Sequence, residues 1–218
     1  MKVLDAIKEY KVVCIIRKVR TEQILQATEI MLQEGIRLFE VTLDQSSEEG
    51  IKESLRQIGL LKKTFEDRIY LGAGTVMTEE QVNRAKGAGA AYIISPNTDE
   101  AVIRQTVKQG LVSIPGAMTP TEIAFAYRCG AHMVKLFPAG TLGPRYIKDL
   151  QGPLGYIPLI AVGGVDVKNM KDFLDAGVQG VGIGSSLAGS SVINDGKWDV
   201  LRERAKAYVE IVNQYRGL

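Results

Sequence analysis

The sequence contains few of the residues that build metal centres, disulfide frameworks or histidine-based active sites. Among its 218 residues, His132 is the only histidine, and there are two cysteines. A single histidine argues against a His-based metal site, and any Ser-His-Asp triad would have to use His132. His132 has no acidic or histidine neighbour in the sequence, so we expect a structural role for it and no bound metal.

The cysteines and the apolar segments indicate a cytoplasmic protein. Cys14 and Cys129 lie far apart, without the spacing of metal ligands, which favours free, reduced thiols. The opening residues are interrupted by Asp5, Lys8 and Glu9, so we expect no signal-peptide core there. No apolar run is long enough to cross a bilayer, which predicts a protein without membrane contact.

The charge of the chain is nearly balanced. Lysine and arginine number 27 against 25 acidic residues, giving a formal net charge of +2. The basic residues form no run or stripe, so we expect no nucleic-acid partner. Hydrophobic residues make up 45% of the chain, which is typical of a folded globular protein. Any functional charge is therefore expected to be local.

One pattern repeats from end to end: a short apolar run, a turn, and a longer amphipathic stretch. Eight such runs, rich in valine and isoleucine, are typical of parallel strands buried on both faces. The eight runs are VVCIIR (12–17), LFEVTL (38–43), IYLGAG (69–74), YIISP (92–96), LVSIPG (111–116), MVKLFP (133–138), PLIAVGG (158–164) and GVGIGSS (180–186).

The alternation of strands and helices predicts the fold class, α/β. Thr119-Pro120-Thr121-Glu122 is typical of a helix start, with a capping box and a proline at the first helical position. We also expect a short helix over residues 2–10 at the barrel bottom and a final helix over 198–215. Eight strand–helix units favour a single (β/α)8 TIM barrel over residues 1–218, with a doubly wound open sheet as the alternative.

Ionisable residues inside these apolar strands are candidates for chemistry, since buried strands should be apolar. They are Arg17, Glu40 and Lys135, with Asp44 at a strand end. Lys135 stands between Val134 and Leu136. Burial would lower its pKa, and a neutral amine can attack a ketone.

A purely structural explanation exists for the same residues. Lys135 and Glu40 could form a buried ion pair, although such pairs rarely add net stability. Glu40 could shuttle protons through water or serve only as a counter-ion. The strand context alone leaves both interpretations open.

Glycines at the ends of the last two strands suggest an anion site. Gly163-Gly164 closes the seventh run, and Gly184-Ser185-Ser186 closes the eighth. Backbone N–H groups in such turns bind phosphate, and barrels frequently hold phosphate after these two strands. The alternative is that these are only tight turns. Likewise, Thr75 could contact substrate or simply form a turn at the barrel rim.

The order of motifs resembles a known family. The segments FEVTL, GAGTV, ISPN, SIPGAMTPTE, VKLFPAG and IAVGGV resemble the 2-dehydro-3-deoxy-6-phosphogluconate (KDPG) and 4-hydroxy-2-oxoglutarate (KHG) aldolases. The resemblance extends from about Val12 to Leu187. It implies a class I aldolase on a (β/α)8 barrel, generally trimeric and cytoplasmic.

The resemblance also implies roles for individual residues. Lys135 matches the Schiff-base lysine and Glu40 the general acid/base. Thr75 in GAGTV and Phe137 in VKLFP match residues that contact the keto acid, and Pro96 in ISPN is expected beside them. The implied phosphate site comprises Gly163, Gly164, Gly184, Ser185 and Ser186.

One position departs from the pattern of the gluconate-type enzymes, where EVTL is commonly followed by an arginine that binds the substrate carboxylate. Here it is followed by Asp44, which would repel that group. Galactonate-type relatives carry an arginine at the end of strand one instead, as Arg17 does here. Arg17 is therefore the expected carboxylate clamp, and the departure favours a galactonate-like or relaxed preference.

The predicted activity is cleavage of a 2-keto-3-deoxy-6-phospho sugar acid to pyruvate and glyceraldehyde 3-phosphate, without a cofactor. The substrate is of the phosphogluconate or phosphogalactonate type, and 4-hydroxy-2-oxoglutarate is a further candidate. Two alternatives stay open at this point. One is a phosphate-sugar isomerase or epimerase on the same barrel, and the other is a non-catalytic barrel that binds a phosphorylated acid.

Overall fold

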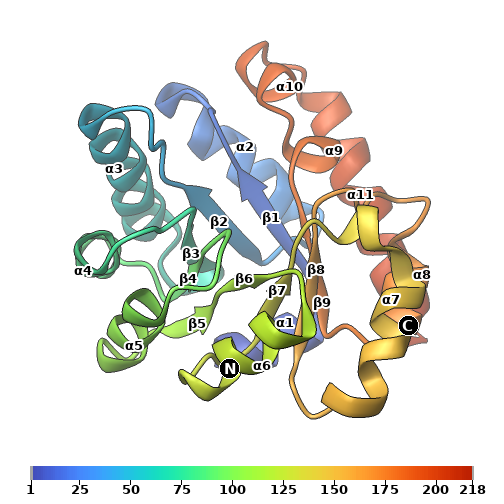
Figure 1. The fold of residues 1–218 in the computed structure, drawn as a ribbon. Coiled ribbons are helices and arrows are strands. Elements are labelled where there is room, and N and C mark those ends of the chain that lie inside the picture. The colour runs from blue at the N-terminus through green and yellow to red at the C-terminus, as the bar shows by residue number, and fades with distance from the viewer. Residues whose placement is uncertain (1, 218) are drawn as a thin grey trace.

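The computed structural model describes residues 2–217 and shows parallel strands arranged as a barrel with helices outside (Figure 1). The order of neighbouring strands is β5-β4-β3-β2-β1-β9-β8-β7-β6, and every pairing is parallel. The strands are β1 Val12–Ile16, β2 Leu38–Thr42, β3 Tyr70–Gly74, β4 Tyr92–Ile94, β5 Val112–Ile114, β6 Gly116–Ala117, β7 Val134–Leu136, β8 Leu159–Val162 and β9 Gly180–Ile183.

The fifth predicted run is divided into β5 and β6 at Pro115. Proline has no N–H to continue a ladder. β5 pairs with β4, whereas β6 pairs with β7. The same short segment therefore joins the two ends of the strand order and nearly closes the ring. The predicted barrel is confirmed, and the open doubly wound sheet is wrong.

Helices follow the strands and cover the outside of the barrel. Thr119 forms the predicted capping box with Glu122, and Ser47, Thr78 and Asp99 accept backbone hydrogen bonds at other helix starts. The helices are α1 Val3–Tyr10, α2 Thr21–Gln33, α3 Glu48–Phe65, η1 Glu66–Arg68, α4 Glu79–Gly87, α5 Glu100–Lys108, α6 Pro120–Arg128, α7 Ala139–Leu154, α8 Met170–Asp175, α9 Ser185–Ala188, α10 Ser190–Asn194 and α11 Trp198–Arg216.

The apolar core has two parts. One lies between the strands and the outer helices. The other fills the barrel, where Val3, Ala6 and Ile7 of α1 pack with inward-facing strand residues such as Leu38 and Ile160. In Figure 1, α1 lies below the strands, at the end where they begin. The expected helix at the barrel bottom is confirmed, and the opposite end is left open for a site.

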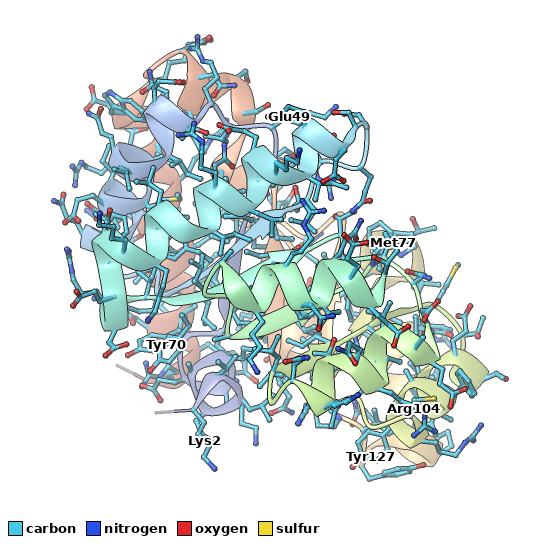
Figure 2. The ribbon with its side chains drawn as sticks, turned by 90° about the vertical axis from the view of Figure 1, so that its left-hand side faces the viewer. Lys2, Glu49, Tyr70, Met77, Arg104 and Tyr127 are labelled. Atoms are coloured by element: carbon cyan, nitrogen blue, oxygen red, sulfur yellow. The ribbon has the colours of Figure 1, made fainter. Side chains whose placement is uncertain are left out.

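Figure 2 shows the two ends of the barrel from the side, with α3, α4 and α5 packed next to one another. Glu49 and Met77 lie near the ends where α3 and α4 begin, which is also where the preceding strands end. Lys2 and Tyr70 lie at the other end of the barrel. Across residues 2–217, no helix is long and apolar enough to span a membrane.

Candidate active site

A cavity of about 450 Å³, called the main cavity below, opens where the strands end. Active sites of (β/α)8 barrels lie at this face. The cavity collects every predicted site residue except Thr75: Arg17, Glu40, Pro96, Lys135, Phe137, Gly163, Gly164, Gly184, Ser185 and Ser186. Residues separated by more than 160 positions are thus brought to one place by the closure of the barrel.

Lys135 enters the cavity from the middle of β7, and its side chain is buried, with 7% of the residue exposed. Burial lowers the pKa of Lys135, Glu40 opposes that change, and the positive charge of Arg17 reinforces it. Lys135 Nζ lies 4.8 Å from the centre of the Phe137 ring. Burial and Arg17 thus shift the protonation equilibrium of Lys135 toward the neutral amine, whereas Glu40 and the Phe137 ring favour the charged form.

Glu40 lies on β2 with 2% of its surface exposed. Its Oε2 atom is buried and makes no hydrogen bond. Burial raises the pKa of Glu40, while Lys135 and Arg17 act in the opposite direction. Within residues 2–217, none of the ion pairs closer than 4.0 Å joins Glu40 to Lys135. A direct ion pair therefore does not account for these two buried groups.

The room for Glu40 comes from glycines on β3, which the sequence interpretation did not assign to the site. A Cβ on Gly74 would overlap the Glu40 carboxylate, and a Cβ on Gly72 would overlap the ring of Tyr92. The Tyr92 hydroxyl donates to the Phe39 carbonyl at 2.7 Å. The alternating glycines of Gly72-Ala73-Gly74 were the available signal, since alternate residues of a strand share one face.

Arg17 connects the cavity to Thr75. Nη2 of Arg17 donates to Oγ1 of Thr75 at 3.0 Å, and Arg17 itself is exposed. Thr75 does not line the main cavity, but this hydrogen bond joins it to the residues that do. The two candidates thus form one polar unit at the rim.

Asp44 does not line the main cavity, although it lies close enough to Arg17 for the two charges to interact. Its Oδ1 atom accepts a hydrogen bond from the Ser46 N–H at 3.1 Å. Hydrogen bonds from Ser46 are the main reason that the pKa of Asp44 is lowered. The side chain borders a separate pocket of about 120 Å³, which Arg17 also borders. The turn after β2 thus engages this carboxylate outside the main cavity.

The glycine turns are shaped by close backbone contacts. Gly163 and Gly164 have φ values of +85° and +75°, a region that favours glycine. The Gly140 N–H donates to the Gly163 carbonyl at 2.7 Å, and a Cβ on Gly164 would lie 2.9 Å from Gly140 Cα. Glycine is therefore needed at positions 163 and 164 partly for the shape of the turn.

Gly184 precedes the first turn of α9, whose leading N–H groups have no partner within the helix. Ser185 is exposed. The Ser186 hydroxyl is engaged by protein groups, since it accepts from Tyr208 at 2.8 Å and donates to the Val165 carbonyl at 3.4 Å. Ser185 and the backbone thus offer freer donors than the Ser186 side chain.

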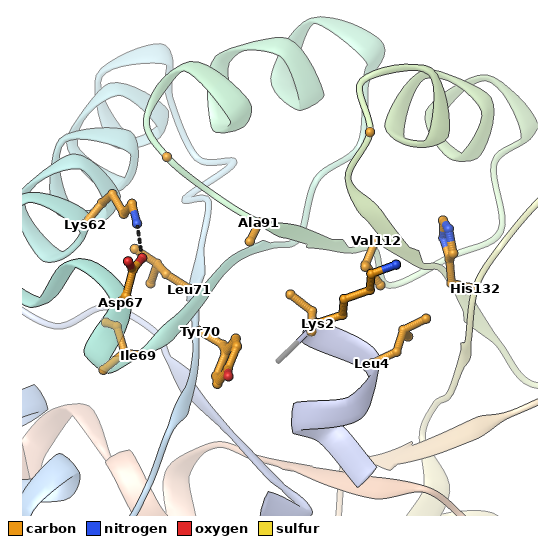
Figure 3. A pocket seen from close by; sticks show the side chains of 13 residues that line it. Lys2, Leu4, Lys62, Asp67, Ile69, Tyr70, Leu71, Ala91, Val112 and His132 are labelled. Atoms are coloured by element: carbon orange, nitrogen blue, oxygen red, sulfur yellow. Dashed lines mark hydrogen bonds and ion pairs between the residues drawn. The ribbon is translucent and has the colours of Figure 1, made fainter. Parts of the chain in front are cut away.

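A larger cavity of about 830 Å³ lies at the opposite end, next to the start of α1 (Figure 3). Its charged residues include Lys62 and Asp67, which form an ion pair of 3.4 Å. His132, on its border, accepts a hydrogen bond from the Ser113 N–H through Nδ1 at 3.1 Å, as suits a structural histidine. Among the described residues that line this larger cavity, there is no buried amine and carboxylate like Lys135 and Glu40 of the main cavity.

Neither cysteine belongs to the site. Cys14 and Cys129 are buried free thiols, and burial raises the pKa of each. Within the described part of the chain, no group of three or more histidine, cysteine or acidic residues is placed to hold a metal ion.

A barrel with a buried amine at its open end is the arrangement that an aldolase using a lysine requires. Comparison with known proteins specifies the family. The family model of KDPG and KHG aldolases matches residues 3–203. The chain is 34% identical to the 2-dehydro-3-deoxy-6-phosphogalactonate aldolase of Escherichia coli over 183 residues, which is 83% of this chain and 86% of that protein.

Solved structures agree with the sequence relatives. A structure described as native KDPGal has a TM-score of 0.83 and 31% identity, covering 95% of this chain and 96% of the other. A KDPG aldolase of Legionella pneumophila, with pyruvate captured as a covalent carbinolamine, has a TM-score of 0.85 and 27% identity, covering 94% and 97%.

The chain belongs to the KDPG and KHG aldolase family. It is a class I aldolase, a carbon–carbon lyase, and the isomerase or epimerase alternative is not supported.

Proposed function

We propose that the protein cleaves a 2-keto-3-deoxy-6-phospho sugar acid to pyruvate and glyceraldehyde 3-phosphate through a Schiff base on Lys135. The observation that carries the proposal is the buried Lys135 amine in one cavity with the buried, unpaired carboxyl group of Glu40. The names of the relatives support the choice of substrate class.

The first half of the reaction forms the Schiff base. The neutral amine of Lys135 attacks the C2 carbonyl and gives a carbinolamine. Glu40, whose pKa burial raises, supplies a proton directly or through water so that the former carbonyl oxygen leaves as water. The product is an iminium ion, which can accept the electron pair of the bond that breaks.

The iminium ion then allows the C3–C4 bond to break and the products to leave. Glu40 or its water takes the proton of the C4 hydroxyl, the C3–C4 electron pair moves toward the iminium, and the aldehyde leaves. The remaining enamine takes a proton at C3, and hydrolysis frees pyruvate and restores the Lys135 amine. Atoms and electrons balance over these steps without an external oxidant, reductant or cofactor.

Substrate binding is assigned to the remaining cavity residues. Arg17, held by Thr75, binds the carboxylate, and Phe137 and Pro96 border the keto-acid end. The phosphate binds at Gly163, Gly164, Gly184, Ser185 and Ser186, mainly through backbone N–H groups and the Ser185 hydroxyl. Binding energy from the remote phosphate then positions the reacting carbons.

Galactonate-type stereochemistry is the proposed preference, with 4-hydroxy-2-oxoglutarate as a weaker substrate. It is supported by the 34% identity to the galactonate-type enzyme and by Arg17 at the end of β1. A side-by-side assay of the two phosphorylated sugar acids and 4-hydroxy-2-oxoglutarate, with Lys135→Met as control, tests the proposal. We expect the highest kcat/KM for the galactonate-type acid. Full activity of Lys135→Met would contradict the proposed mechanism.

We further propose that the enzyme is a homotrimer in the cytoplasm, as the family resemblance implies. Large exposed apolar side chains around a groove beside the main cavity support self-association: Met118, Phe125 and Phe137 border it and are 42%, 37% and 38% exposed. Light scattering after size exclusion should give three times the 23.8 kDa chain mass. A monomer mass would contradict the proposal.

A further inference from the structure

Two glutamines outside the main cavity lie beside the residues at its rim. Gln45 follows β2, and Gln81 lies in α4. Nε2 of Gln45 donates to Oε1 of Gln81 at 3.1 Å, and Nε2 of Gln81 donates to Oε1 of Gln45 at 2.9 Å. The two amides form a reciprocal pair that joins the loop after β2 to the helix after β3.

The glutamine pair holds the loop that carries Thr75. Nε2 of Gln45 donates to the Thr75 carbonyl at 2.7 Å, and the Met77 N–H donates to Oε1 of Gln81 at 2.7 Å. The pair therefore contacts the backbone on both sides of Val76. Met77 marks this loop in Figure 2.

Thr75 needs such support because its backbone conformation is unusual. Its φ is +56°, a region that a β-branched residue rarely adopts and that costs free energy. In this conformation its hydroxyl accepts the hydrogen bond from Arg17. If the loop relaxed to an extended conformation, the hydroxyl would move away from the guanidinium group.

We propose that Gln45 and Gln81 are positioning residues that set the orientation of Arg17 through Thr75. An exposed arginine loses side-chain entropy when it binds a ligand, and holding it in place beforehand reduces that loss. The inference rests on the proposed function, in which Arg17 binds the carboxylate of the keto acid. It predicts that the glutamines affect substrate binding more than the chemical step.

The test replaces Gln45 by methionine, which keeps the length of the side chain and removes its hydrogen bonds. The Arg17–Thr75 hydrogen bond would then be weakened, so we expect KM for the phosphorylated keto acid to rise about threefold to tenfold, the effect of losing that one bond, with kcat changed by less than about twofold. The matched control is Gln105→Met, which removes a side-chain bond from α5 to Asn83 of α4 and leaves the bonds of Gln45 and Gln81 in place. It should leave KM unchanged, and urea unfolding verifies that both variants fold.

A double-mutant cycle with Arg17→Met separates this inference from the proposed function. If Arg17→Met does not raise KM, the clamp assignment fails. If Arg17→Met raises KM but Gln45→Met does not, only the positioning inference fails. We expect Gln45→Met to have no further effect on KM in the Arg17→Met background. Equal effects of Gln45→Met in both backgrounds would overturn the inference, because the glutamine would then act independently of Arg17.

Discussion

Gly74 of β3 leaves open the space that the carboxylate of Glu40 on β2 occupies. The two strands pair in parallel with Glu40 opposite Gly72, and Gly74, two residues further along β3, lies on the same face as Gly72. The position of the proposed proton shuttle thus depends on a neighbour that carries no functional group.

Replacing Gly74 by alanine tests that dependence. The added methyl group would displace the carboxylate, so we expect kcat to fall by about a hundredfold, the lower range for losing a positioned acid or base. Steady-state cleavage assays measure the effect. Gly87→Ala is the matched control, because a Cβ at Gly87 in α4 has nothing within 4 Å. Unchanged kcat in Gly74→Ala would show that the placement of Glu40 does not limit the reaction.

The pH dependence of kcat/KM tests the electrostatics of the amine. Burial lowers the pKa of Lys135, and the charge of Arg17 lowers it further. The acid limb of the profile, which reports loss of a proton from Lys135, should therefore lie below the ordinary lysine pKa of 10.5. In Arg17→Met it should move to higher pH. If the acid limb of Arg17→Met stayed at the wild-type pH, a group other than Lys135 would determine it.

The stability of the protein should also depend on Glu40 and pH. Because burial raises the folded-state pKa of Glu40, the native state retains a proton that the unfolded chain loses above the ordinary glutamate pKa of 4.5. Wild-type protein should therefore lose stability relative to Glu40→Gln as the pH rises from 4.5 toward the raised folded value. Urea unfolding at several pH values measures the difference. A constant difference across that window would contradict the raised pKa.

Gly164 should matter for phosphate binding. In Gly164→Ala the residue would have a disfavoured positive φ and a Cβ 2.9 Å from Gly140 Cα. We expect KM for a phosphorylated substrate to rise about tenfold, as distortion of the turn removes backbone donors, with a smaller change for 4-hydroxy-2-oxoglutarate. Gly110→Ala is the control, since Gly110 has φ +73° but no neighbour within 4 Å of the added Cβ. Equal effects on both substrates would argue against a phosphate site.

Much of the fold was predictable because it rests on local patterns. The eight apolar runs and the capping box at Thr119 mark strands and helix starts within a few residues of where they occur. Lys135 was recognisable because an ionisable side chain in a short buried strand is rare. The division of the fifth strand at Pro115 was visible in the sequence as a proline, but its role in joining β4 to β7 depends on the closed ring.

The arrangement around the site was less predictable because it depends on distances between loops. The sequence placed Asp44 after β2, but the bond from Ser46 that engages its carboxylate outside the main cavity depends on the turn. The reciprocal pair of Gln45 and Gln81 joins positions 36 apart through geometry that no spacing rule gives. Such contacts follow from the tertiary structure.

The most direct test of the account is to add pyruvate and borohydride and to map the modified residue by mass spectrometry. Reduction converts an iminium between the keto acid and an amine into a stable secondary amine. We expect one pyruvyl adduct, on the peptide that contains Lys135, and none in Lys135→Met. Absence of the adduct from wild-type protein, or its appearance on another lysine, would contradict the assignment of Lys135.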